Sequence, residues 1–281
     1  MNEVLTVEDQ GEAPAFGRDE RPIFFMHIAK TAGSYLNARF ADALGEDSVA
    51  PHIENRVGEA AKVKEMLDAG VRVFSGHVMY EAWKMIAGPH AGRFRKVTIL
   101  RDPIEHLVSH LLWLDHYNLP EFRSEYRHLD EAHRRVVDEI GSIDLTDVGA
   151  LDGYLTGLSG TAMRLFDNCQ SRYFTTPGRR TMDAIRPMTL ADRFAVAGAA
   201  RDFDAVIFQD DLEAGLIELS GIVGVPLQHS DTRVNSGRAS RKIDTSSPLV
   251  RQILGRRTLL DQWLWRHLKN EVGAKPVTAH A

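Results

Sequence analysis

The chain has 281 residues and a formal net charge of −5, which gives no sign of a general affinity for nucleic acid. A hydrophobic share of 43% with a charged share of 26% is typical of one large globular domain, alone or with an inserted helical lobe. The single cysteine, Cys169, excludes a disulfide framework within the chain, and we expect it to be a small buried side chain in a reducing compartment.

Residues 1–20 are acidic and lack the basic region and apolar stretch of a signal peptide. No later stretch approaches the length of a membrane span. We therefore expect a flexible tail at residues 1–20, a single domain at residues 21–281, no integral membrane span and a cytoplasmic location.

An apolar run at residues 23–29 has the length and character of a buried strand. The loop KTAGS follows at residues 30–34, and apolar side chains then recur every four residues from Leu36, as on one face of a helix. The first N–H groups of a helix have no partner within it and carry the positive end of its dipole, so an anion binds there readily. We therefore expect a phosphate-type anion at this loop, beside the charge of Lys30.

The side chains of this loop suit phosphate but do not form the ATP/GTP-binding loop. Gly33 allows close approach of the backbone, and Thr31 and Ser34 offer hydroxyl groups. The ATP/GTP-binding motif needs a lysine directly before the hydroxyl residue, whereas Lys30 lies four residues before Ser34. An ordinary strand-to-helix turn with a solvated lysine is the alternative.

A second unit of the same kind lies at residues 96–117. Residues 97–100 indicate a buried strand, after which Arg101 places a cation beside the start of a helix. Pro103 suits the first helical position, with Asp102 as the N-cap. Ser109 lies about two turns into the helix and can face the same side as its start. The alternative for Arg101 is a salt bridge that caps the helix.

The loop KTAGS after an apolar strand resembles the 5′-phosphosulfate loop of sulfotransferases that use 3′-phosphoadenosine 5′-phosphosulfate (PAPS), and it is most similar to the carbohydrate branch, whose loop reads P-K-T-A-G-T-S. Ala29 and Tyr35 depart from that pattern. The second unit resembles the family's 3′-phosphate site, R-D-P-x-x-R-x-x-S, in which Arg101 and Ser109 match and His106 replaces the second arginine. The resemblance implies that the 5′-phosphosulfate is held by Lys30, Thr31, Ala32, Gly33, Ser34 and Tyr35.

The resemblance also implies the fold class: α/β, with a P-loop-NTPase-like central parallel sheet flanked by helices and an inserted helical lobe at residues 118–165. Further strands are expected at 71–78 and 204–209, and helices at 57–69, 80–86, 189–202, 211–223 and 248–272. In the family, a basic loop after the last core helix closes over the cofactor; here it would contribute Arg238 and Arg241, and an exposed loop with scattered charge is the alternative. The stretch FDNCQSRYF resembles a family element, N-x-Q-x-R, for which a site role and a helix-capping turn are equally open. The matching residues are Asn168, Gln170 and Arg172.

Sulfuryl transfer requires a cation at the leaving phosphate and a base at the acceptor hydroxyl. Lys30 is placed for the first task. His77 is the candidate base, because it ends a predicted strand and because its G-H-V context resembles the base-bearing motif of uronyl 2-O-sulfotransferases; His27 and His52 are next in line. His106 and His110 have a spacing that can bind metal, but no third ligand is obvious, so no metal site is expected.

We therefore expect a PAPS-dependent sulfotransferase that acts on a hydroxyl of a carbohydrate, a lipid or a small metabolite, with PAPS as co-substrate and no metal. A P-loop-type nucleotide kinase or NTPase is one alternative. A non-catalytic phosphonucleotide-binding protein is another.

Overall fold

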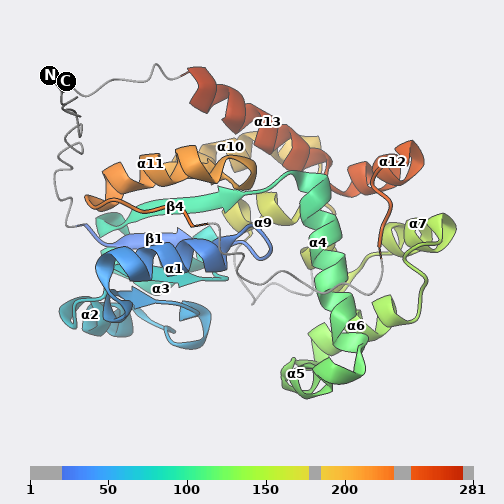
Figure 1. The fold of residues 1–281 in the computed structure, drawn as a ribbon, viewed down its shortest axis with the longest axis horizontal. Coiled ribbons are helices and arrows are strands. Elements are labelled where there is room, and N and C mark those ends of the chain that lie inside the picture. Colours follow the sequence, from blue (N-terminus) through green and yellow to red (C-terminus); the bar gives the residue numbers. More distant parts are fainter. Residues whose placement is uncertain (1–20, 177–184, 231–241, 275–281) are drawn as a thin grey trace, which may run out of the picture.

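The computed structural model describes residues 21–176, 185–230 and 242–274. Its centre is a five-stranded sheet in the order β2-β3-β1-β4-β5, in which each neighbouring pair is parallel. The prediction of an α/β fold with a central parallel sheet is confirmed (Figure 1). The strands are β1 (Ile23–Met26), β2 (Val49–Ala50), β3 (Val73–Gly76), β4 (Arg95–Leu100) and β5 (Ala205–Phe208).

Helices make up most of the remaining described residues, including the predicted helical stretch at residues 118–165. They are α1 (Gly33–Leu44), α2 (Ala60–Asp68), α3 (Tyr80–Ala87), α4 (Pro103–Asp115), α5 (Arg123–His128), α6 (Glu131–Gly141), α7 (Val148–Thr156), α8 (Gly160–Phe166), α9 (Cys169–Thr175), α10 (Arg193–Ala200), α11 (Leu212–Val223), α12 (Pro248–Arg257) and α13 (Leu259–Ala274).

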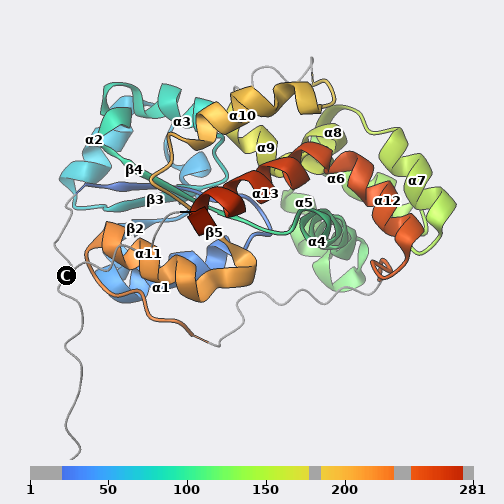
Figure 2. The same ribbon diagram turned by 90° about the horizontal axis from the view of Figure 1, so that it is seen from above.

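Both faces of the sheet are covered by helices, which explains why β1 and β5 are continuously apolar. Side chains alternate along β1, so that Ile23 and Phe25 pack with α1 and α11, while Phe24 and Met26 pack with α2, α3, α10 and α13. Figure 2 shows α1 and α11 on one side of the sheet and α2, α3 and α10 on the other. The strand predicted from the apolar run is thus present, and the structure shows that it is buried on both sides.

A second hydrophobic core lies beside the sheet, among α4, α6, α7, α8 and α12. Leu111 of α4, Ile140 of α6 and Leu254 of α12 are fully buried there. We call this group of five helices the helical lobe (Figure 2). Because α4 belongs to this lobe and begins directly after β4, the lobe forms one wall at the carboxyl end of the sheet.

The strand order places a topological switch point between β1 and β4. The chain leaves β1 towards β2 and leaves β4 towards β5, which are opposite edges of the sheet. In parallel α/β sheets, ligands bind in the crevice outside the carboxyl ends of such a strand pair. The two predicted phosphate units follow β1 and β4, so they flank this point.

The structure differs from the sequence predictions in several boundaries. The strand predicted at 23–29 ends at Met26, and the short strand β2 was not predicted. The single terminal helix predicted at 248–272 is two helices, which break at Thr258. The side chain of Asn168 explains the break, because its Oδ1 accepts hydrogen bonds from the N–H groups of Leu260 and Asp261 in the first turn of α13.

No helix in the described ranges is long and apolar enough to span a membrane. The tail predicted at residues 1–20 lies outside the described residues.

Candidate functional site

The loop between β1 and α1 has an unusual backbone. Lys30 and Ala32 have φ angles of 68° and 73°, in the left-handed region that residues with a Cβ rarely adopt. The hydroxyl of the fully buried Thr31 donates a hydrogen bond of 2.8 Å to the carbonyl oxygen of Ile28, which fixes the loop from within. Left-handed residues cost on the order of 1–3 kcal/mol each and concentrate at ligand-binding sites. Because the hydroxyl of Thr31 donates its proton to Ile28, it holds the loop and does not donate to a ligand.

The N-terminus of α1 is uncapped. The side chain of Ala32, its N-cap, has no oxygen to accept a hydrogen bond. The N–H groups of Gly33, Ser34 and Tyr35 have no partner among the described residues. Three free N–H groups at the positive end of a twelve-residue helix can bind an anion.

His27 lies directly beneath this helix start. A Cβ atom on Gly33 would lie 2.0 Å from the Cδ2 of His27, so only glycine fits here. The ring of His27 also contacts that of His77, with 4.4 Å between ring centroids. Burial, and secondly the charge of His77, lowers the pKa of His27 well below its usual value, so it is a neutral part of the wall. His27 thus joins the predicted anion-binding loop, residues 30–34, to the histidine predicted as the base.

Two cationic side chains meet between the loops that follow β1 and β4. The Nη1 of Arg101 donates a hydrogen bond of 3.3 Å to the carbonyl oxygen of Lys30, so the two units that resemble phosphate sites lie in direct contact. Burial and then the charge of Arg101 lower the pKa of Lys30, and burial lowers the pKa of Arg101 against the opposing charges of Glu105 and Asp102. Neither Lys30 nor Arg101 has an ion-pair partner in the described part of the chain, and the Nε of Arg101 is buried without a hydrogen-bond partner there. Two such cations favour a bound anion.

Arg101 is held from behind by Gln170. The backbone N–H of Arg101 donates to the Oε1 of Gln170, and the Nε2 of Gln170 donates to the carbonyl oxygen of Arg101, both at 2.9 Å. Of the two roles left open for this element, the structure shows a supporting one. Arg172 forms a buried ion pair of 2.6 Å with Asp167, and Asn168 caps α13. These contacts explain the N-x-Q-x-R pattern as a brace for the site.

The start of α4 was predicted correctly. The carboxylate of Asp102 accepts hydrogen bonds of 3.0 Å from the N–H groups of Ile104 and Glu105, as an N-cap does.

Further along α4, Ser109 is half-buried, and its hydroxyl has no hydrogen-bond partner among the described residues. The Nζ of Lys30 lies 5.6 Å from the ring centroid of Trp113, so α4 forms one wall of the cation site.

His106, which stands where the family has a second arginine, does not act as a cation. It is buried, and burial lowers its pKa to about 4. Its Nε2–H donates a hydrogen bond of 2.8 Å to the carbonyl oxygen of Ala29. His106 therefore ties α4 to the anion-binding loop, and Lys30 and Arg101 are left as the two cations.

His77 follows β3 and has the orientation that a base requires. Its Nδ1 lies 2.7 Å from the carbonyl oxygen of His27. A carbonyl oxygen can only accept, so the proton is on Nδ1 and the lone pair on Nε2. The ring still reaches solvent, but the packing around it lowers its pKa, against the opposing charge of Glu54. His77 is therefore neutral at neutral pH and has a free Nε2.

Glu54 is a site residue that the sequence analysis missed. Its Oε2 accepts a hydrogen bond of 3.0 Å from the backbone N–H of His77, and its Oε1 lies 3.3 Å from the Nδ1 of His52. A Cβ on Gly76 would lie 2.2 Å from the Oε2 of Glu54, so a glycine before His77 allows this approach. Glu54 precedes His77 by 23 residues on a separate segment, and the sequence carries no local signal of the contact.

The side chain of Tyr35 turns away from the cations. Its hydroxyl accepts a hydrogen bond of 3.1 Å from the N–H of Ser230, and its ring packs against His229. Only its backbone N–H belongs to the anion site. The side chain instead anchors the segment that precedes the predicted basic loop, whose Arg238 and Arg241 lie outside the described residues.

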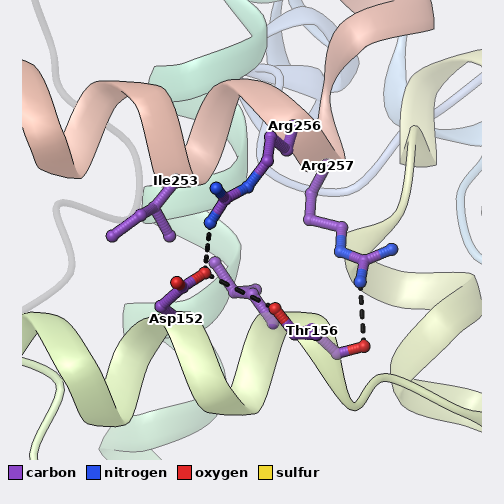
Figure 3. A pocket seen from close by; sticks show the side chains of 6 residues that line it. Asp152, Thr156, Ile253, Arg256 and Arg257 are labelled. Atoms are coloured by element: carbon purple, nitrogen blue, oxygen red, sulfur yellow. Dashed lines mark hydrogen bonds and ion pairs between the residues drawn. The ribbon is translucent and has the colours of Figure 1, made fainter.

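A separate hollow lies between α7 and α12 in the helical lobe, and Figure 3 shows its lining. Arg256 is paired with Asp152 there, and Arg257 donates to the carbonyl oxygen of Thr156 and pairs with Asp167 at 3.6 Å. Its charges are already neutralised within the protein. Lys30 and Arg101, which have no ion-pair partner among the described residues, lie elsewhere, at the end of the sheet.

The arrangement can bind a polyanion between Lys30, Arg101 and the start of α1, with a neutral imidazole close by. Comparison with known proteins adds no family to this description: no protein-family model matches the chain, and a search of the curated proteins finds no match.

Proposed function

We propose that this protein is a sulfotransferase that transfers the sulfuryl group of PAPS to a hydroxyl group of a carbohydrate, a lipid or a small metabolite, on a P-loop-NTPase-like fold. One observation carries the proposal. Two partly buried cations, Lys30 and Arg101, meet without an ion-pair partner among the described residues, at a helix N-terminus with three free N–H groups. An adenosine bisphosphate carries two phosphate groups that such a site would separate and bind.

The two cations would divide the work. Lys30 and the N–H groups of Gly33, Ser34 and Tyr35 would hold the 5′-phosphosulfate. Arg101, with the hydroxyl of Ser109, would hold the 3′-phosphate, as the sequence resemblance implies. The contacts of Ala32 would be those of its backbone, because its side chain carries no polar group. Arg238 and Arg241 stay predicted contacts of the closing loop.

The transfer itself would need few groups. The acceptor oxygen attacks the sulfur atom, the bond between sulfur and the 5′-phosphate oxygen breaks, and 3′-phosphoadenosine 5′-phosphate leaves with the electron pair. The Nε2 of His77 takes the acceptor proton, and Lys30 stabilises the charge that grows on the leaving phosphate. Donors fixed in advance act most strongly on such developing charge, which suits the braced positions of Lys30 and Arg101.

The nucleotide kinase or NTPase alternative has weaker support. Such enzymes hold a magnesium ion with a carboxylate near the phosphates. The carboxylate nearest in sequence to Arg101 is that of Asp102, and it caps α4. A non-catalytic phosphonucleotide-binding protein would keep the cation site without needing a free Nε2 on His77.

Calorimetry with adenosine 3′,5′-bisphosphate and with ATP, each with and without magnesium, tests the nucleotide site. We expect the bisphosphate to bind more tightly than ATP and without a metal requirement; equal affinities, or strict dependence on magnesium, would overturn the proposal. An acceptor screen with PAPS that reads bisphosphate release then tests for catalysis. Bisphosphate binding without release on any hydroxylated acceptor would favour the non-catalytic alternative.

A further inference from the structure

Three buried side chains of types that ligate metals lie together between α4 and the start of α9. His106 and His110 are one turn apart on α4, and Cys169 is the first residue of α9. One nitrogen of each histidine and the Sγ of Cys169 all lie within 4.8 Å of one another. The histidine spacing alone has no third ligand, and the fold supplies one from a residue far along the chain.

One ring nitrogen of His110, a member of this cluster, is unsatisfied. Its side chain is 2% exposed, and its Nδ1 has no hydrogen-bond partner among the described residues. Aromatic rings surround it, with centroids of Phe166 and Trp113 at 5.6 Å and 5.8 Å. A buried nitrogen without a partner destabilises the folded protein, and an ion bound at that nitrogen is one of the recognised explanations.

His106 is oriented as a metal ligand is. Its Nε2–H donates to the carbonyl oxygen of Ala29, which leaves the lone pair on Nδ1. A metal-binding histidine almost always donates its other ring N–H to a carbonyl or carboxylate in this way. Burial keeps both imidazoles neutral, because it lowers the pKa of His106 to about 4 and that of His110 well below its usual value.

The ligand set and the surrounding charge select the kind of ion. Thiolate and imidazole ligands suit Cu(I) and Zn(II). Lys30 lies close enough to lower the pKa of both histidines, and Arg101 that of His106, so additional positive charge is unfavourable here. With a deprotonated Cys169, Cu(I) leaves the cluster neutral, whereas Zn(II) leaves it with one positive charge. The cluster also offers three ligands from the described residues, a low coordination number that suits Cu(I) better than Zn(II).

We propose that His106, His110 and Cys169 form a buried binding site for one Cu(I) ion. Binding exchanges the thiol proton of Cys169 for the ion, so one proton is released and no electron is transferred. The ion would link α4 to the start of α9 and, through His106, brace the loop that carries Lys30. Copper binding at this site does not presuppose the proposed sulfotransferase activity.

The test is an anaerobic titration of the full-length protein with Cu(I) in competition with a chromophoric Cu(I) chelator, followed by X-ray absorption spectroscopy. We expect one ion per chain, bound by one sulfur and two nitrogen atoms. The Cys169→Ser and His110→Phe variants should each lose more than about 100-fold in affinity, since loss of a ligand should exceed the loss caused by an outer-shell partner.

His52→Ala is the matched control. It alters the other cluster of potential ligands, His52, Glu54 and His77, and should leave Cu(I) affinity unchanged. Thermal unfolding without copper shows whether each variant is folded. The X-ray absorption spectrum of the wild type tests the set of ligands without relying on any variant. Failure of the wild type to bind Cu(I), a spectrum without a sulfur ligand, preference for Zn(II), or unchanged affinity in folded Cys169→Ser would each overturn the proposal.

Discussion

Replacement of Lys30 by methionine should stabilise the ligand-free protein and at the same time weaken its binding of bisphosphate. Methionine keeps most of the length and apolar stem of lysine but removes the charge. Lys30 is partly buried and has no ion-pair partner among the described residues, while burial and the neighbouring Arg101 lower its pKa. In the absence of an anion, its charge is therefore a net cost to the folded state.

The expected magnitudes follow from the surroundings of Lys30. An unsatisfied buried polar group costs about 1–3 kcal/mol, and the partial exposure of Lys30 argues for the lower end. A gain of about 1 kcal/mol raises the melting temperature of a chain of this size by about 2–4 °C. A hydrogen bond to a charged group contributes about 1.5–3 kcal/mol, so loss of the lysine–phosphate contact should weaken binding by about 10- to 150-fold.

Thermal unfolding of wild type and Lys30→Met, each with and without adenosine 3′,5′-bisphosphate, measures both effects. Lys64→Met is the matched control, because Lys64 is exposed and paired with Asp68 at 2.5 Å, and such surface pairs contribute little. The control should change neither quantity by much. A Lys30→Met protein that is less stable than wild type without ligand, yet gains as much stability from bisphosphate, would refute the argument and make Lys30 a structural residue.

Three further outcomes are expected. His77→Ala should lower turnover by about 10²–10⁴-fold while bisphosphate affinity stays near wild type. The wild-type rate should fall with decreasing pH only below the usual histidine pKa, because the folded protein lowers the pKa of His77, and an inflection above pH 6.5 in steady-state kinetics would contradict this. Ala32→Gly should leave the free energy of unfolding unchanged or raise it by up to about 1 kcal/mol, since glycine relieves a left-handed φ. The control Ala38→Gly, inside α1, should lower the free energy of unfolding by about 1 kcal/mol, and equal losses for both variants in denaturant titrations would exclude strain at Ala32. Gln170→Leu should lower the free energy of unfolding by about 2 kcal/mol and weaken bisphosphate binding, because both hydrogen bonds to the backbone of Arg101 are lost. A bisphosphate affinity equal to wild type in calorimetry would show that binding does not need the support of Arg101 by Gln170.

The parts of the site that are local in sequence could be predicted. The anion-binding loop and the start of α4 each consist of a strand, a turn and a helix start that are continuous in the chain, and Asp102 caps α4 as its pattern predicts. The side-chain roles of Thr31 and Tyr35 could not be predicted in the same way. Each carries a hydroxyl in a phosphate-type loop, but the first bonds within the loop and the second bonds to Ser230.

The contacts that depend on the packing of distant segments could not be predicted from the sequence. Glu54 reaches His77 from a short segment after β2, and Gln170 reaches Arg101 from α9. In neither pair does a periodic pattern or a sequence motif link the two residues. The break between α12 and α13 has the same origin, since Asn168 caps the first turn of α13 from outside while the hydroxyl of Thr258 donates to the carbonyl oxygen of Leu254.

The anion-binding loop lies where the sheet and the helical lobe meet, and this position explains how a strained backbone is maintained there. Left-handed residues persist only where the surrounding structure fixes them. The loop is fixed from inside by Thr31, from below by the contact of Gly33 with His27, and from the lobe by the hydrogen bond of His106 to Ala29. Arg101 is fixed in turn by Gln170. The backbone at Lys30 and Arg101 is thus fixed without a ligand. Binding of the proposed anion would therefore cost less ordering entropy, and the repulsion between the two cations would become attraction for that anion.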